Sequence, residues 1–94
     1  MSYRAEKFNL AILELASGEG RVQERLMHAV VGNNLLFLDD HFEDDLIVDY
    51  LALKGKLVRE GSLSATIEQM TPDEALLIID KILDIYSELC KRGE

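Results

Sequence analysis

The sequence predicts an all-α fold, a small bundle of about four main helices, and three observations support this. Apolar residues recur at three- and four-residue steps, which is the period of a helix that buries one side. Four stretches carry this pattern, at approximately residues 3–17, 21–37, 41–60 and 72–92. No stretch alternates apolar and polar residues between turn signals, so we expect no strand.

The helix expected at 72–92 has the clearest boundaries. Thr71 is a good N-cap, Pro72 suits the first helical position, and Gly93 can adopt the left-handed conformation that ends a helix. Two apolar stripes run along it: Ala75, Ile78, Ile82, Ile85 and Leu89, and beside them Leu76, Ile79, Leu83, Tyr86 and Cys90. Two adjacent stripes make a wide apolar face, so we expect this helix to be central. The second stripe predicts a buried, inert thiol at Cys90, whereas Leu77 falls among polar residues and should be partly exposed.

The first two helices are expected to be antiparallel, because only the short connector Gly18–Gly20 separates them. The second contains Gly32 followed by two asparagines, which leaves two alternatives. Either the helix stops there and Leu35–Leu38 plugs the core, or the helix continues to Leu38 with a weak spot. We favour a break or kink near Gly32, and Leu35, Phe37 and Leu38 are too apolar for an exposed loop.

The third helix, at 41–60, is expected to begin at an Asp40 N-cap with Glu43 in capping-box spacing. Its two seams are Phe42, Leu46, Tyr50, Leu53 and Leu57, and then Ile47, Leu51 and Val58. A short fifth segment capped by Ser64 is expected before the last helix.

Length and charge limit the classes of function. Ninety-four residues suffice for a single helical domain, 1–94, and not for two. The 18 acidic and 10 basic residues give a net charge of −8, which disfavours direct binding to nucleic acid or to anionic membranes. The single cysteine forms no internal disulfide and fits a reducing cytoplasm. No apolar run is long enough to span a bilayer, and the N-terminus does not resemble a signal peptide.

The most unusual local feature is an acidic stretch. No lysine or arginine lies between Leu26 and Leu53, and the same stretch holds Asp39, Asp40, Glu43, Asp44, Asp45 and Asp49. One interpretation is a solvated helix start that promotes solubility; the other is a surface that docks a basic partner protein. The function hypothesis is therefore a non-catalytic protein-binding module, such as an inhibitor, an antitoxin- or immunity-like factor, or a regulatory subunit. In a narrower version, the acidic surface imitates DNA.

Two alternatives come from other classes. A homo-oligomeric structural protein is one, because wide apolar seams in so short a chain leave surface for self-association. A metal-binding bundle enzyme is the other, with Glu24, His28, His41 and Asp45 as candidate ligands. Each of these carboxylate–histidine pairs has four-residue spacing, whereas di-metal bundles use Glu-x-x-His with further glutamates. We therefore expect no metal, no cofactor and no catalytic residues.

Overall fold

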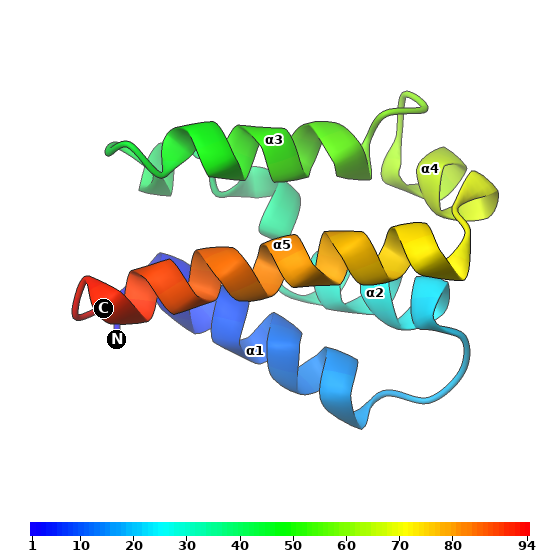
Figure 1. Cartoon of the computed structure of the whole chain (residues 1–94), viewed down its shortest axis with the longest axis horizontal. Helices are drawn as coiled ribbons and strands as arrows, with labels where there is room; N and C mark the ends of the chain where they lie inside the picture. The colour runs from blue at the N-terminus through cyan, green and yellow to red at the C-terminus, as the bar shows by residue number, and fades with distance from the viewer.

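The computed structural model describes all residues 1–94 and contains helices but no strands, which confirms the all-α class (Figure 1). The α-helices are α1 (Tyr3–Ser17), α2 (Val22–Gly32), α3 (Ile47–Leu57), α4 (Leu63–Gln69) and α5 (Pro72–Lys91). Two 3₁₀ turns, η1 (Leu35–Phe37) and η2 (Asp39–His41), connect α2 to α3. None of the helices combines the length and the apolar character needed to cross a membrane.

Helix α5 is central, as predicted. Helices α1, α2 and α3 all pack against it, with α1 and α3 on opposite sides in Figure 1. The whole first stripe, from Ala75 to Leu89, is buried. The predicted cap is present, because Thr71 Oγ1 accepts a hydrogen bond from the Glu74 amide at 3.1 Å. Burial of this stripe by three neighbouring helices, rather than helix propensity, supplies most of the stability of α5.

The second stripe of α5 is less buried than predicted. Ile79 and Tyr86 are half-buried, but Leu76 and Leu83 are 52% and 43% exposed, and the Cys90 thiol is exposed. The prediction of a buried thiol is therefore wrong. The thiol is exposed because the neighbouring helices lie beside and behind α5, so that no helix covers the outer surface of α5.

The connector after α2 follows the first of the two alternatives. Helix α2 ends at Gly32, and Asn34 adopts the left-handed conformation with φ 54°. Leu35 and Leu38 then plug the core, as that alternative expects. Phe37 does not enter the core, and its side chain is 79% exposed.

The start of the third helix was predicted wrongly. Helix α3 begins at Ile47 and not near residue 41, so Asp40 and Glu43 form no capping box. The chain forms η2 and then leaves the helical region at Phe42 (φ −118°, ψ 78°). Helix α3 also ends at Leu57, three residues short of the predicted 60.

Two smaller expectations also need correction. The fifth segment is present as α4, but its N-cap is Ser62, whose hydroxyl accepts from the Ala65 amide, and not Ser64. The second seam of α3 is only partly covered, since Leu51 is exposed and Ile47 and Val58 are half-buried.

Candidate functional site

The acidic stretch runs along η2, the following loop and the start of α3. We call it the acidic surface; it comprises Asp39, Asp40, Glu43, Asp44, Asp45 and Asp49. Three basic residues from outside the stretch between Leu26 and Leu53 form ion pairs with it. Lys54 pairs with Asp39 at 2.7 Å, Arg4 with Asp44 at 2.7 Å, and Arg92 with Asp45 at 2.7 Å. Half of the predicted partner-binding carboxylates are therefore engaged within the chain.

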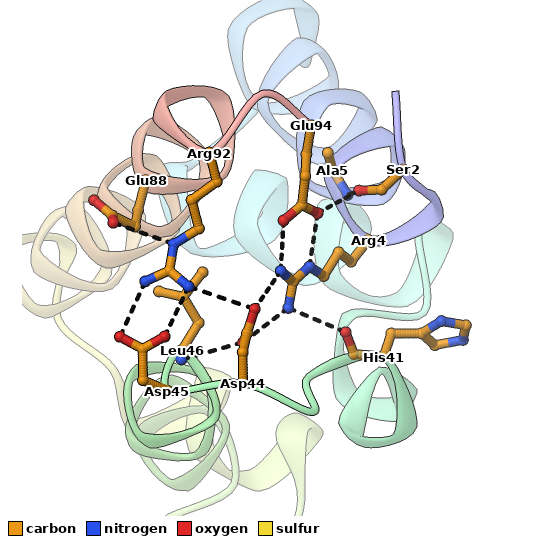
Figure 2. A network of polar contacts seen from close by, with 10 residues as sticks. All are labelled: Ser2, Arg4, Ala5, His41, Asp44, Asp45, Leu46, Glu88, Arg92 and Glu94. Atoms are coloured by element: carbon orange, nitrogen blue, oxygen red, sulfur yellow. Dashed lines mark hydrogen bonds and ion pairs between the residues drawn. The ribbon is translucent and has the colours of Figure 1, made fainter.

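Arg4 is the centre of the largest polar network (Figure 2). Its side chain is almost fully buried and donates to both oxygens of Asp44, at 3.1 and 2.7 Å. It also donates from Nε to Glu94 Oε1 at 2.8 Å and from Nη1 to the His41 carbonyl at 3.2 Å. Its guanidinium carbon lies 4.9 Å from the ring centroid of Phe42. Arg4 thereby connects α1, the loop before α3 and the end of the chain.

These contacts change the acidity of the two carboxyl groups. Hydrogen bonds from Arg4 lower the pKa of Asp44 to about 2 and the pKa of Glu94 to about 2. The same bonds raise the pKa of Arg4 above its usual range. All three groups therefore stay charged at neutral pH, and the network holds the loop in place.

Arg92 forms a second, more exposed set of ion pairs. It donates to both oxygens of Asp45, at 2.7 and 3.1 Å, and also reaches Glu88 at 3.2 Å. The bonds from Arg92 lower the pKa of Asp45, and the bond from Lys54 lowers the pKa of Asp39. Because the Asp45 side chain is largely exposed, water screens this pair more than the Arg4 network.

The other three acids, Asp40, Glu43 and Asp49, are exposed and take part in no ion pair. The six carboxylates and the three cations Arg4, Lys54 and Arg92 sum to −3, and Glu94 and Glu88, which share Arg4 and Arg92, add two further negative charges beside them. The surface therefore keeps a negative field, and that field comes from fewer residues than the sequence predicts.

The segment that leads into this surface is fixed by buried hydrogen bonds. The Tyr50 hydroxyl donates to the Leu35 carbonyl at 2.6 Å and accepts from the Leu38 amide at 3.0 Å. Asn33 Nδ2 donates to the Ala29 carbonyl at 2.8 Å. Phe37 projects from this fixed backbone into solvent and is the most exposed large apolar side chain of the protein.

A charged groove of about 520 Å³ lies between α3 and α5. Asp49 and Lys56 line it from α3, and Lys81 and Asp84 from α5, while Leu53 contributes to its apolar part. None of these four charged side chains has an ion-pair partner within the chain. Its mixed charges select no single class of ligand, and it shares Asp45 and Asp49 with the acidic surface.

The candidate metal ligands do not come together. No group of three or more histidine, cysteine, aspartate or glutamate side chains is placed to hold a metal ion. Glu24 pairs with Arg21 at 3.1 Å, and the His41 ring packs on Tyr3 with centroids 4.6 Å apart. In Figure 2 the His41 ring and Asp45 lie at opposite ends of the Arg4 network, while His28 is exposed on α2.

Sequence reasoning gave no role to Arg4 or Arg92, placed Tyr50 only in a core seam and wrongly expected Phe37 to be buried. One signal was available for Arg4, because Arg4, Phe8 and Ala11 share the core-facing side of the first helix. A charged residue at such a position needs a partner inside the fold. Nothing local marks Arg92, whose main partner is 47 residues away in the chain.

A scan against protein-family models found no match, and searches of curated proteins and of solved structures found none either. The function proposed below therefore rests on the chain's own geometry.

Proposed function

We propose that the chain is a non-catalytic protein-binding module that docks a basic partner protein through the acidic surface. One observation carries this proposal: the exposed Phe37 stands on a backbone held by buried hydrogen bonds, a few residues before the unpaired carboxylates of Asp40 and Glu43 in the chain. An aromatic anchor with charged neighbours is the usual composition of an interface hot spot and its rim.

The rigidity of the segment favours binding. A loop that must be ordered on binding loses affinity, because its conformational entropy is lost at that step. Here the Tyr50 hydroxyl and the Arg4 side chain already hold the backbone at Leu35, Leu38 and His41. Phe37 can therefore enter an apolar pocket of a partner without a change in the main chain.

The partner expected for this surface presents an apolar pocket bordered by lysine or arginine. Asp40, Glu43 and Asp49 supply the opposite charge, which accelerates association and selects basic partners. The role as an inhibitor, an antitoxin- or immunity-like factor or a regulatory subunit fits this chemistry. The narrower DNA-imitating version has less support, because internal cations already neutralise half of the carboxylates. We also propose a cytoplasmic location, supported by the free, exposed Cys90.

The experiment is a tagged pull-down from native lysate, eluted by a salt step and read by mass spectrometry. The test variant reverses Asp40, Glu43 and Asp49 to lysine and spares Asp44 and Asp45, which hold Arg4 and Arg92. A second variant is Phe37→Ala. The matched control reverses to lysine Glu6, Glu19 and Glu68, which are exposed, unpaired and outside the acidic surface.

We expect one basic protein, released by salt, to be captured by the wild type and by the control. The triple reversal should lose it, and Phe37→Ala should weaken its retention, with helical circular dichroism unchanged in both. Equal capture by all four proteins would refute the proposal.

A further inference from the structure

The exposed side of α5 carries an apolar stripe with a seven-residue repeat. Leu76, Leu83 and Cys90 are seven residues apart, and Ile79 and Tyr86, also seven apart, lie between them. We call these five residues the α5 stripe. Alternating three- and four-residue steps sustained over two heptads are the pattern with which one helix packs along another.

Within the chain, the α5 stripe is covered on one edge only. Lys81, Asp84 and Glu88, on one side of α5, line the groove with α3. Helix α1 lies on the other side of α5 in Figure 1. Ile79 and Tyr86 are half-buried and pack against the core. The line through Leu76, Leu83 and Cys90 stays open to solvent.

Two unpaired charges indicate the direction of the missing helix. Asp73 and Lys91 are 18 residues apart, which is about five turns, so both lie on one line of the outer surface of α5. Neither takes part in an ion pair within the chain, and they stand at opposite ends of the helix. An antiparallel copy of α5 would bring Asp73 of each chain close to Lys91 of the other.

A parallel copy would oppose like charges at both ends and would also place Asp80 opposite Asp80. The helix dipoles likewise favour the antiparallel arrangement, since the acidic first turn then meets a basic last turn.

We propose that a second copy of this chain covers the α5 stripe, so that two α5 helices pack antiparallel around a twofold axis near Leu83. Leu83 is the middle residue of the α5 stripe. Only a twofold axis near Leu83 places the stripe of one chain against the stripe of the other over its full length. In a symmetric pair the same patch serves both chains, which a stripe centred on one residue satisfies. Leu76 of each chain then faces Cys90 of the other, and the two Cys90 residues stand about 21 Å apart, from 14 residues at about 1.5 Å each.

The dimer uses α5, whereas the acidic surface lies on η2, the loop and the start of α3. The dimer proposal therefore does not depend on the proposed function. If both proposals are correct, the dimer carries two acidic surfaces and can bind two copies of the partner protein.

The first test is the mass in solution, measured by sedimentation equilibrium over a series of dilutions. We expect a reversible dimer of twice the 10.6 kDa chain at high concentration. Leu83→Asp should yield a folded monomer, judged by circular dichroism. The control Leu77→Asp alters a more exposed leucine of α5 that is outside the stripe and should leave the dimer intact. A monomeric mass at every concentration, or a dimer unaffected by Leu83→Asp, would overturn the proposal.

The second test fixes the orientation by disulfide cross-linking under mild oxidation. Leu76→Cys in the chain that keeps Cys90 should give a covalent dimer, because each new thiol faces Cys90 of the other copy. The wild type and the double variant Leu76→Cys, Cys90→Ser should not cross-link, since their like thiols are about 21 Å apart. Efficient cross-linking of the wild type through Cys90 would indicate parallel helices and overturn the antiparallel arrangement.

Discussion

Replacing Tyr50 with phenylalanine tests how firmly the loop before α3 is held. The side chain is fully buried, and its ring stacks on Phe42 with centroids 4.5 Å apart, a contact that phenylalanine retains. Only the hydroxyl is lost, and with it the bonds to the Leu35 carbonyl and the Leu38 amide. Both residues are buried, so water cannot replace these bonds without opening the loop.

The expected loss follows from those two orphaned groups. A buried donor or acceptor left without a partner costs about 1–3 kcal/mol, so with two such groups we expect Tyr50→Phe to lower the free energy of unfolding by about 2–6 kcal/mol. A chain of this length is stable by about 5–14 kcal/mol, so the loss is a large fraction of the total. Each kcal/mol lost corresponds to a fall in Tm of about 4–8 °C for a chain of this length.

The assay is urea and thermal denaturation followed by circular dichroism. Tyr3→Phe is the control, because the Tyr3 hydroxyl makes no hydrogen bond within the chain and its side chain is exposed. Burial raises the pKa of Tyr50 to about 12, above its ordinary value of 10.0. The stability that the neutral hydroxyl contributes is therefore complete below pH 10 and is lost as the pH rises towards 12. The gap between wild type and Tyr50→Phe should narrow over that window; a loss no larger than that of Tyr3→Phe would refute the reasoning.

Three further predictions concern acid, glycine and a helix cap. Hydrogen bonds from Arg4 lower the pKa values of Asp44 and Glu94 to about 2, so the free energy of unfolding should fall as the pH drops from about 4.5 towards 2. The fall should be less steep in Glu94→Gln. An acid profile identical to that of the wild type would contradict this role of Glu94. Gly55→Ala should raise the free energy of unfolding by about 0.5–1 kcal/mol, because an added Cβ meets nothing within 4 Å. Gly61→Ala should lower it by about 1 kcal/mol, since φ there is +94°. Thr71→Ala should lower it by about 1 kcal/mol through loss of the α5 cap. Urea denaturation measures all of them, and a sign opposite to either glycine prediction would contradict the backbone argument.

The parts of the fold with local signals could be predicted from the sequence. Thr71 and Pro72 mark the start of α5, and the residues that follow repeat with the helical period, so its bounds were nearly right. The second helix was predicted to span 21–37, and the favoured alternative, a break or kink near Gly32, is where α2 ends, because Gly32 and two asparagines interrupt the pattern. In these cases the neighbours in sequence decide the conformation.

The start of α3 could not be predicted because distant residues decide it. Leu38, Phe42, Leu46 and Tyr50 are four apart, as along a helix, yet the chain reaches them by 3₁₀ turns and a loop. The His41 carbonyl accepts a hydrogen bond from Arg4, and the Leu38 amide donates one to the Tyr50 hydroxyl. These backbone groups are therefore engaged by side chains and not by the hydrogen bonds of a helix. Such competition depends on tertiary contacts that a local pattern does not contain.

The acidic surface illustrates the same limit for a site. Its composition was evident, but which carboxylates remain available depends on Arg4 and Arg92, which lie near the two ends of the chain. Phe37 was expected to be buried because its neighbours are apolar, whereas Leu35 and Leu38 are buried, Leu36 is half-buried and Phe37 is exposed. Counts of charge or apolar residues in a window do not distinguish these cases.

The outer position of α3 has a consequence for how the native state opens. Helices α1, α2 and α5 pack on one another, whereas α3 packs mainly on α5, α4 and η2. Detachment of α3 is therefore a subglobal unfolding event that leaves α1, α2 and α5 packed on one another. Tyr50 leaves with α3, so the same event releases the loop that carries Phe37. A ligand that binds only the closed loop would suppress this opening, and its binding energy would appear as slower amide exchange in α3 rather than in α1 or α2.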